Sequence, residues 1–349
     1  MDHHSRRKWQ EIPIHSSDHH HRIIMTRVQE SSVTPPSSSS NASSVSAVLG
    51  VVNDKNPKEL HGIVNLEQYK LCKEDHEEAF ASLVQESRKE LCENSVVTLP
   101  NFLTQSAIDI LVQETQNVQH KAYYRDEHST HNVYLTQTMD ESKPPTHIYN
   151  RQVITSKGCV TNDYLPASSL LETLYHNQTF KQFVEHVLQV KNIYPYSPRD
   201  RLSSITVHYS SNGQELGWHF DNSAFAITLL LQKPQHGGVF EYVPHIRNKD
   251  AAIDTSSSTT NDEEVTMGFQ TVEGVVDGRI RPRQLELNAG TLVLFHGRNS
   301  LHRVTKVVGE TTRILVVLAY NEKEDMELPD DAKLIFFGRT GKEDVEDER

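Results

Sequence analysis

The sequence predicts an α+β protein in which helices come first along the chain and a β-sheet core follows. In the first part, apolar residues recur at helical spacing, with Phe80, Val84 and Leu91 as an example. From Ser203 onward apolar and polar residues alternate, as in Ile205 to Tyr209, and about seven short strands with Gly-rich turns follow. Short strands of this kind favour a sandwich or barrel over a parallel sheet with crossover helices.

The composition is that of a soluble protein with a substantial core. The chain has 349 residues, of which 36% are hydrophobic, and no apolar run approaches the roughly 20 residues that a membrane-spanning helix requires. The first residues also lack the apolar centre of a secretory signal, so we expect a cytoplasmic protein without a membrane partner. A transit peptide remains an open alternative.

The charge and the cysteine content argue against several further classes of protein. The formal net charge is −12, which argues against a general nucleic-acid binder because affinity for phosphate backbones comes mainly from clustered Lys and Arg. A local basic patch stays open. Cys72, Cys92 and Cys159 are odd in number and widely spaced, which favours reduced thiols over a disulfide framework or a thiolate zinc site.

Composition also divides the chain. Residues 1–60 are rich in Ser and His without apolar periodicity, so we predict a disordered tail. Residues 61–325 form the predicted domain, and residues 326–349 are an acidic C-terminal tail. Within the domain, a stretch rich in Ser, Thr and Asp at about 248–262 predicts a mobile insertion.

The first ordered elements are a helix, a strand and a second helix. Apolar spacing predicts a helix over Glu77 to Asn94, and the β-branched run from Ser95 predicts a strand that ends at Pro100. Either Thr104 or Ser106 can cap the next helix, whose apolar face carries Ile108, Leu111 and Val112.

Between Tyr123 and Val160 the pattern is irregular and polar. This segment could be plain surface or a substrate-binding loop, since loops on rigid scaffolds often supply binding groups. Its clustered polar residues are Tyr124, Arg125, Asp126, Glu127, His128, His131 and Asn132. Two more helices are predicted afterwards, on the apolar residues Leu170, Leu171 and Leu174, and Phe180, Phe183, Val184, Val187 and Leu188.

Alternation predicts the strands of the β core and one further helix. The helix spans Glu263 to Val275 and ends at Gly278. The strands after the first, which begins near Ile205, are Asp221 to Gln232, Val239 to Val243, Gln284 to Leu287, Thr291 to Phe295, His302 to Val308 and Arg313 to Tyr320.

A histidine and an aspartate two residues apart introduce the chemistry. On a strand, His219 and Asp221 would point to the same side, about 7 Å apart, and could share one ion. With 20 histidines in the chain, however, roughly one His-x-Asp triplet is expected by chance, and two polar residues at a strand entrance are the alternative. The pair needs support from elsewhere in the chain.

That support comes from a second histidine and an arginine downstream. His302 follows within the polar stretch after a strand, and Arg313 begins the last apolar strand, eleven positions later. Two imidazoles and one carboxylate on one face of a metal, with the other positions open, are typical of non-haem Fe(II) oxygenases. His219, Asp221 and His302 supply that set.

The order and spacing of these residues resemble the Fe(II)/2-oxoglutarate-dependent dioxygenases. The resemblance runs from about Val96 to Tyr320 and implies a double-stranded β-helix, or jelly-roll, core flanked by the N-terminal helices. The two blocks that carry it are HYSSNGQELGWHFDNSAFAITLLLQKPQHGGVFEYVPHIR and GTLVLFHGRNSLHRVTKVVGETTRILVVLAY. Within the superfamily, LLLQ, GGVFEYVPHIR and GRNSLHRVT look closest to amino-acid hydroxylases and carrier-independent lysine halogenases.

The resemblance implies catalytic and metal roles for His219, Asp221 and His302, with Fe(II), 2-oxoglutarate and O2 as cofactors and cosubstrates and ascorbate as a candidate reductant. Arg313 would pair with the distal carboxylate of 2-oxoglutarate, since a guanidinium binds a carboxylate through two hydrogen bonds. A charged residue in an apolar strand also needs a partner if it is buried, and an outward-facing Arg is the alternative.

This sequence departs from the family in one residue of the cosubstrate site. The family often has Ser or Thr two residues after the Arg, where Leu315 stands here. Thr291 and Tyr209 are the candidates to replace it, because relatives often place a cosubstrate-binding Tyr ten residues before the first ligand. Ordinary core packing is the alternative for Tyr209.

Rival ligands and substrate contacts remain. His296 could replace His302, although the match at SLHRV favours His302, and His208 alternates out of phase with Tyr209 and is expected to be structural. A supporting or surface position is the alternative for each residue that could contact the substrate: Trp218, Asn222, Glu241 and Arg298.

The implied activity is hydroxylation of an unactivated C–H bond of a small polar molecule, with a free amino acid as the expected substrate. The related halogenases carry Gly where this chain has Asp221, which opens a coordination position for chloride, so the carboxylate favours hydroxylation. The alternatives are a protein or peptide hydroxylase of prolyl or lysyl type, with the acidic surface and the insertion as recognition sites, and a catalytically dead jelly-roll binding module.

Overall fold

A computed structural model describes residues 57–124, 130–136, 138–247 and 262–341. Most of the predicted N-terminal tail and of the predicted insertion therefore lies outside the described residues, as do Arg125 to His128. Cys72, Cys92 and Cys159 form no disulfide with one another. Among the described helices, none has both the length and the apolar character that crossing a membrane requires.

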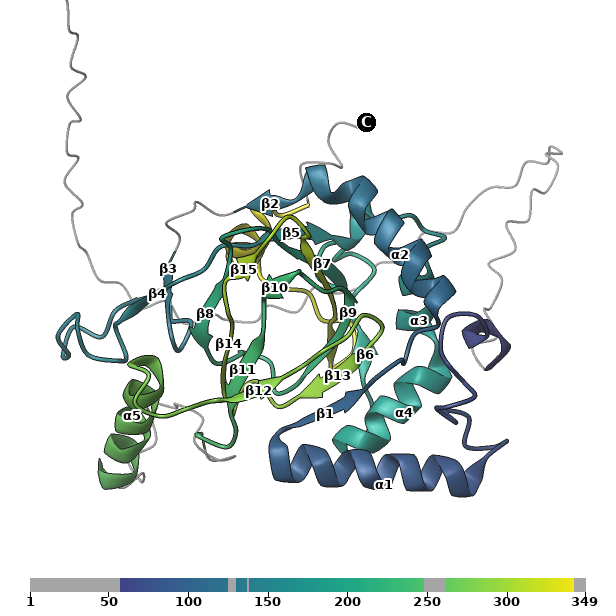
Figure 1. Ribbon diagram of the computed structural model, residues 1–349, viewed down its shortest axis with the longest axis horizontal. Helices are drawn as coiled ribbons and strands as arrows, with labels where there is room; N and C mark the ends of the chain where they lie inside the picture. Colours follow the sequence, from purple (N-terminus) through teal and green to yellow (C-terminus); the bar gives the residue numbers. More distant parts are fainter. Residues whose placement is uncertain (1–56, 125–129, 137, 248–261, 342–349) are drawn as a thin grey trace, which may run out of the picture. The chain divides into compact units, whose positions relative to one another are not determined.

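Two antiparallel sheets form the β core, so the predicted α+β class is confirmed (Figure 1). The larger sheet has the strand order β1-β13-β9-β16-β7-β5-β2 and the smaller has the order β12-β11-β14-β8. The larger sheet consists of β1 (Val96–Leu99), β2 (Tyr123–Tyr124), β5 (Gly158–Thr161), β7 (Ile205–Ser210), β9 (Ala226–Gln232), β13 (Leu292–Phe295) and β16 (Arg313–Leu318). The smaller consists of β8 (Leu216–His219), β11 (Phe240–Val243), β12 (Arg283–Leu285) and β14 (Leu301–Val304).

Short strand pairs and single helical turns connect these elements. The pairs are β3 (Thr130–Asn132) with β4 (Gln152–Ile154), β6 (Tyr194–Pro195) with β17 (Tyr320–Asn321), and β10 (His236–Gly237) with β15 (Val307–Val308). The 3-10 turns are Pro57–Leu60, Gln119–Lys121 and Asn162–Tyr164.

Four helices lie beside the larger sheet, on the side of β1, β9 and β7, as predicted (Figure 1). They are α1 (Glu77–Asn94), α2 (Gln105–Val118), α3 (Leu170–His176) and α4 (Gln178–Leu188). The open choice of cap for α2 falls on Thr104, whose side chain accepts a hydrogen bond from the Ala107 N–H. The predicted bounds of α1 are confirmed, and the helix stops because Ser95 takes a left-handed conformation.

Two further helices lie later in the chain, one between β11 and β12 and the other after β17. α5 (Asp262–Val276) corresponds to the predicted helix, and Gly278 just beyond it has a positive φ of 76°. α6 (Asp330–Phe337) lies in the predicted acidic tail, but it is packed: Lys333 and Phe337 are buried. The Lys333 ammonium lies 3.3 Å from the carboxylate of the buried Asp200, so an internal ion pair attaches the described part of the tail to the domain.

Successive side chains on the strands of the larger sheet point alternately into two regions: the apolar core beneath the helices and the space between the two sheets. On β7, Ile205, Val207 and Tyr209 join the main apolar core beneath the helices. The residues between them face the space between the two sheets, and so does Leu315 of β16, which packs with apolar residues of both sheets. Apolar side chains fill one part of that space. Its remaining part carries polar groups.

Two predicted strands differ from the structure. The strand predicted over Asp221 to Gln232 begins only at Ala226, because the Asp221 N–H donates to the Gly297 carbonyl oxygen and the exposed residues after it form bends. The strand predicted over His302 to Val308 is divided into β14 and β15. Polar turn residues outweigh the apolar alternation at both places.

Candidate metal centre and its surroundings

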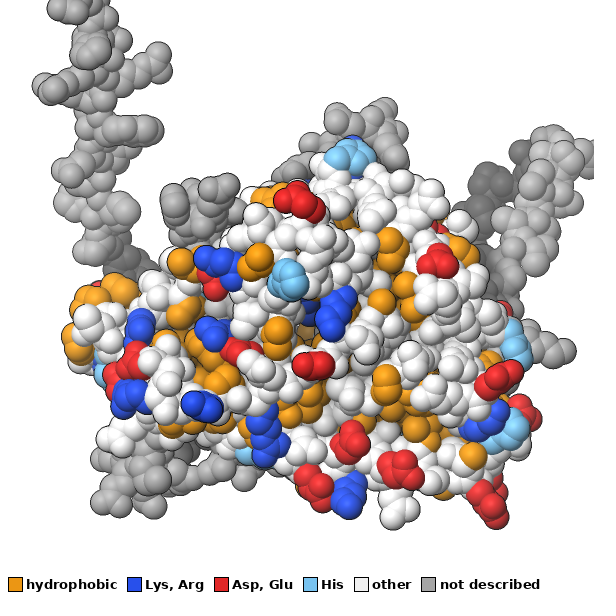
Figure 2. Space-filling model, in the orientation of Figure 1, with side chains coloured by type: hydrophobic (Ala, Val, Ile, Leu, Met, Phe, Trp, Pro, Cys, Tyr) orange, Lys and Arg blue, Asp and Glu red, His pale blue; other side chains and the backbone are white. Residues whose placement is uncertain are grey.

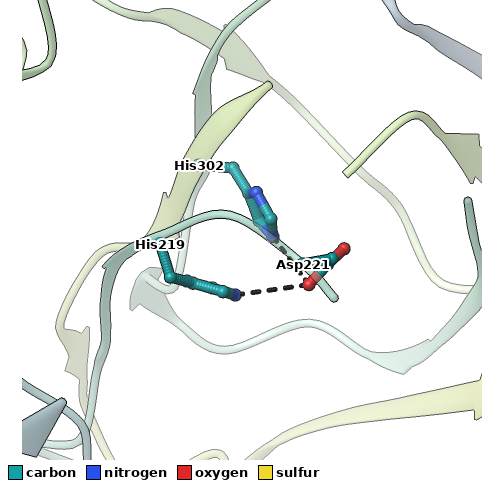
Figure 3. Close-up of side chains that lie close together, drawn as sticks. All are labelled: His219, Asp221 and His302. Atoms are coloured by element: carbon teal, nitrogen blue, oxygen red, sulfur yellow. Dashed lines mark ion pairs between the residues drawn. The ribbon is translucent and has the colours of Figure 1, made fainter. Parts of the chain in front are cut away.

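His219, Asp221 and His302 come together between the sheets (Figure 3). The Nε2 atoms of His219 and His302 lie 3.6 Å and 3.5 Å from Oδ1 of Asp221. One ligand atom from each residue lies within 4.8 Å of the other two, and no other such group of His, Cys, Asp or Glu occurs in the described ranges. The arrangement can hold one metal ion.

Sheet register places the two imidazoles side by side. His219 ends β8 and is the direct partner of His302 on β14, with ring centroids 4.1 Å apart. Each Nδ1 lies against a carbonyl oxygen, that of Gly217 at 2.8 Å for His219 and that of Ser300 at 3.0 Å for His302. A carbonyl can only accept, so each Nδ1 carries the proton. Each Nε2 therefore offers its lone pair to a metal.

Asp221 reaches the cluster from a turn, which corrects the prediction that it shares a strand face with His219. β8 ends at His219, and the chain turns so that the carboxylate comes beside both rings. Gly297 makes this possible, because a Cβ at that position would lie 1.8 Å from Oδ2 of Asp221. The Asp221 side chain is 26% exposed, against 8% for His219 and 6% for His302, so the cluster opens on the carboxylate side.

The pKa shifts favour the metal-binding protonation states. Burial, helped by the neighbouring His302, lowers the pKa of His219 well below its usual range. Burial alone would raise the pKa of Asp221, but attraction to His302 and His219 outweighs it and lowers that pKa to about 2. At neutral pH the cluster therefore contains a neutral His219 and an ionised Asp221, the forms that bind metals.

Arg313 faces the same interior, as predicted, and is only 4% exposed. It is the direct partner of Ser210 on β7 and alternates with Ile314, which belongs to the helix-side core. Within the described part of the chain its guanidinium has no hydrogen bond or ion pair. Burial lowers the pKa of Arg313 to about 10, which leaves it charged at neutral pH. A buried, unpaired cation requires an anionic partner.

The two candidates to assist Arg313 have different surroundings. Thr291 precedes β13, is buried, and its hydroxyl has no hydrogen-bond partner among the described residues. Tyr209 instead donates from its hydroxyl to the Thr115 carbonyl oxygen at 2.5 Å, in helix α2. This corrects the prediction that Tyr209 binds the cosubstrate, because its side chain lies on the helix side of the sheet.

His208, expected to be structural, faces the interior in place of Tyr209. Its Nδ1 lies 2.9 Å from the ammonium of Lys157, a residue that the sequence had not singled out. Burial first, and then the charges of Lys157 and Arg313, lower the pKa of His208 well below its usual range, so it accepts the ammonium proton. Strand alternation could have identified His208, but no pattern in the polar segment before β5 pointed to Lys157.

Two other histidines differ in their relation to the cluster. His296 follows β13 and is not part of the metal-capable group, so the choice of His302 over it agrees with the geometry. His131 of β3 lies close to it, with its ring centroid 5.6 Å from that of His219 and its Nε2 2.8 Å from the Thr155 hydroxyl. The polar segment between Tyr123 and Val160 thus contributes to the surroundings of the site.

Two predicted substrate contacts lie on the wrong face of the smaller sheet. Trp218 alternates with His219 and is buried on the opposite side of β8, where the Arg303 guanidinium lies 4.7 Å from its ring centroid. Glu241 is the direct partner of Arg303 and binds it at 2.6 Å. Neighbours on a strand point in opposite directions, so Trp218 and Glu241 lie on the outer face of the smaller sheet. This corrects the prediction that they contact the substrate.

Asn222 and Arg298 lie at the rim. Both are exposed, and the Arg298 guanidinium donates two hydrogen bonds to the Asn222 carbonyl oxygen, at 2.6 Å and 3.0 Å. Arg298 thereby fixes the turn that carries Asp221. On the face of the molecule seen in Figure 2, a small hollow lies over the β core near β9 and β10, with charged side chains beside it.

Comparisons with solved structures find oxygenases at low similarity. A 2OG-Fe(II) oxygenase family oxidoreductase from Burkholderia pseudomallei is 14% identical, with a TM-score of 0.41, over 69% of this chain and 91% of that one. A prolyl hydroxylase from Trichoplax adhaerens, solved with a hypoxia inducible factor peptide fragment, is 12% identical with a TM-score of 0.42, over 72% and 96%. The epimerase SnoN from nogalamycin biosynthesis is 10% identical with a TM-score of 0.44, over 69% and 81%.

The sequence itself gives the family. No curated protein sequence matches the chain. The family Halogenase D, however, matches residues 80–333, which is more than half of the chain and includes both histidines, Asp221 and Arg313. The chain therefore belongs to the Halogenase D family, which confirms the predicted relation to the Fe(II)/2-oxoglutarate-dependent oxygenases and their halogenase-like members.

Proposed function

We propose that the protein is an Fe(II)- and 2-oxoglutarate-dependent hydroxylase with a jelly-roll core, acting on an unactivated C–H bond of a small, amino-acid-like substrate. One observation carries the proposal. The interior that contains His219, Asp221 and His302 also contains Arg313, a buried cation without a partner among the described residues. A metal site alone would not need that cation. A metal site with an acidic cosubstrate would.

The three ligands fit Fe(II) by their chemistry. They are two imidazoles, each fixed as an Nε2 donor by a backbone carbonyl, and one ionised carboxylate. This set with open positions is typical of non-haem Fe(II) oxygenases. When bound, the metal and 2-oxoglutarate would supply the oxidising power to break the C–H bond, while the protein positions the reactants and excludes water.

The cosubstrate fits the polar part of the interior. Arg313 would hold the distal carboxylate of 2-oxoglutarate through two parallel hydrogen bonds. The Thr291 hydroxyl, buried and without a partner in the described residues, is a second donor. Thr291 lies opposite Leu230, which packs between the sheets, and precedes Leu292, which packs in the helix-side core, so alternation directs Thr291 toward the space between the sheets. Gly238 leaves room for the arginine, since a Cβ there would lie 3.1 Å from the Cδ of Arg313.

Asp221 favours hydroxylation over the halogenation that the family name suggests. With the carboxylate beside both imidazoles, the protein supplies three ligands and leaves no protein-ligand position for a halide. We expect Asp221→Ala to abolish turnover, and Asp221→Gly in chloride to permit some halogenated product, both measured by mass spectrometry of the product. Unchanged hydroxylation by Asp221→Ala would remove Asp221 from the ligand set.

The decisive test of the enzyme is binding. Full-length protein reconstituted anaerobically with Fe(II) should bind 2-oxoglutarate calorimetrically and gain a weak visible charge-transfer band. If it shows neither, the protein is a binding module rather than an oxygenase. Substrate class is tested by coupled succinate formation: stimulation by free basic amino acids and not by peptides supports the amino-acid proposal, and the reverse supports a peptide hydroxylase.

A further inference from the structure

Lys157 introduces a second positive charge into the interior that Arg313 occupies. It immediately precedes β5, whose Gly158 is the direct partner of Tyr209 on β7. One step further in the same register, Lys157 is level with Ser210, and Ser210 is the partner of Arg313. The two cations therefore come from strands on either side of β7, and both project between the sheets.

The Lys157 ammonium is directed by His208. The 2.9 Å contact with Nδ1 of His208 places the ammonium on the interior side of the sheet, because His208 points away from the helix-side core that contains Tyr209. The other ring nitrogen of His208 lies 3.3 Å from the Thr206 hydroxyl, which fixes the plane of the ring. Lys157 has two further N–H groups to donate.

In the described ranges, neither Lys157 nor Arg313 has an acidic group within ion-pair distance, so no described carboxylate neutralises either cation. His208, which directs the Lys157 ammonium, is the partner of Leu315 on β16, and Leu315 pairs with Leu230 on β9. Arg313 lies two residues before Leu315, beside the end of β9 at Gln232, whereas His302 packs against Phe295, the partner of Ala226 at the start of β9. The ammonium therefore lies on the metal side of the residue that carries the guanidinium.

We propose that Lys157, positioned by His208, is a second anchor for the 2-oxo acid cosubstrate and binds its metal-proximal carboxylate. This inference rests on the proposed function. Arg313 then holds the distal carboxylate and Lys157 the carboxylate next to the keto group, so each cation pairs with one negative charge of a dicarboxylate. Lys157 contributes to binding of any 2-oxo acid, whereas Arg313 contributes only when a second carboxylate is present.

Two ligands separate these roles. 2-Oxoglutarate carries both carboxylates, and pyruvate carries only the one beside the keto group. With full-length protein loaded anaerobically with Fe(II), Lys157→Met should weaken calorimetric binding of both acids by about 10- to 100-fold, the effect of losing a charge-assisted hydrogen bond. Arg313→Met should weaken 2-oxoglutarate alone. Lys233→Met, at an exposed lysine just after β9, is the matched control and should change neither.

The positioning role of His208 has its own measurement. His208→Ala should weaken binding of pyruvate as well as of 2-oxoglutarate, because the ammonium loses the acceptor that directs it. His208→Gln, whose side-chain oxygen can accept the same hydrogen bond, should restore most of that loss. Equal loss in both variants would show that His208 merely fills space.

A measurement on the unaltered chain covers the case in which Lys157→Met fails to fold. Acetylation of Lys157 by acetic anhydride, followed by mass spectrometry of peptides, should slow in the presence of either acid, while acetylation of Lys233 should not change. Lys157→Gln offers a second variant that keeps a polar side chain but no charge.

The outcomes distinguish the inference from the proposed function. If the unaltered protein binds neither acid, both fail. If it binds 2-oxoglutarate and the Lys157 variants bind both acids within twofold of it, the inference alone fails. If those variants lose 2-oxoglutarate but keep pyruvate, Lys157 acts at the distal carboxylate and the assignment to the metal end is overturned.

Discussion

Replacing Gly297 by Ala should remove Asp221 from the metal centre. The added Cβ would lie 1.8 Å from Oδ2 of Asp221, so that oxygen must retreat by about 1.6 Å to reach an ordinary contact of 3.4 Å. The backbones cannot separate cheaply, because the Asp221 N–H donates to the Gly297 carbonyl oxygen at 3.1 Å and Arg298 fixes the next residue. The added Cβ would also lie 2.6 Å from Cγ and 2.9 Å from Cβ of Asp221, so the whole side chain, including the Oδ1 that lies beside both imidazoles, must swing away.

The magnitude follows from the length of a metal bond. A carboxylate oxygen binds a metal at about 2.0–2.2 Å, so a displacement of nearly that size breaks the bond. Losing a supporting partner of a ligand already costs about 10- to 100-fold in metal affinity, and losing the ligand itself should cost at least about 100-fold. Crowding should also lower the free energy of unfolding by about 1–3 kcal/mol.

Calorimetric titration of Fe(II) under anaerobic conditions measures the loss of metal affinity. Urea unfolding of the metal-free protein measures the loss of stability. Gly268→Ala is the matched control, because a Cβ at that position of α5 meets nothing within 4 Å. In an Asp221→Gly background, Gly297→Ala should cost almost no further metal affinity. Full metal affinity in Gly297→Ala, alongside a large loss in Asp221→Ala, would refute the steric argument.

Two further predictions concern stability. Asp200→Ala leaves the Lys333 ammonium buried without a partner and also removes the hydrogen bonds that the Asp200 carboxylate accepts from the N–H groups of Leu202, Ser203 and Leu328, so it should lower the free energy of unfolding by about 3–5 kcal/mol, measured in urea. Lys333→Met leaves that carboxylate buried but still hydrogen-bonded to these N–H groups, so it should cost less, and equal losses would contradict this explanation. His208 has its pKa depressed by folding, so its contribution is present above its unfolded pKa near 6.5 and is lost as the pH falls below that value. Between pH 6.5 and 5.5 the loss should be about 1 kcal/mol, and it should be absent in His208→Gln.

Sequence patterns predicted helix bounds and caps, which depend mainly on residues close together in the chain. The bounds of α1 followed from apolar spacing, and its end at Asn94 agrees with the left-handed Ser95 beyond it. The cap at Thr104 was one of two choices that the sequence allowed. The cluster of His219, Asp221 and His302 was predicted because its residue types suit one metal, although the assumed geometry was wrong: Asp221 reaches the cluster through a turn rather than along a strand.

Side-chain direction was the harder problem. Tyr209 was assigned to the cosubstrate by its distance from His219 along the chain, yet the adjacent His208 faces the interior. A shift of one residue exchanges the two faces of a strand, so spacing that passes through a turn fixes a face poorly. Trp218 and Glu241 lie on the outer face of the smaller sheet, because each is adjacent to a residue that faces the interior, His219 and Tyr242. Lys157 could not be found, because only the pairing of β5 with β7 brings it beside His208.

The positions of the two charged ends limit what the interior can bind. The three candidate metal ligands lie at the end of the larger sheet where β9 begins, since His302 packs against Phe295 and Phe295 is the partner of Ala226. Arg313 lies at the other end of β9, because the residue after it pairs with Gln232. A halide or phosphate could satisfy one end but not both. A ligand with a metal-binding head and a carboxylate tail satisfies both ends. Lys157 lies between Arg313 and the candidate metal centre, so its removal should weaken binding of the ligand's metal-binding head more than binding of its carboxylate tail.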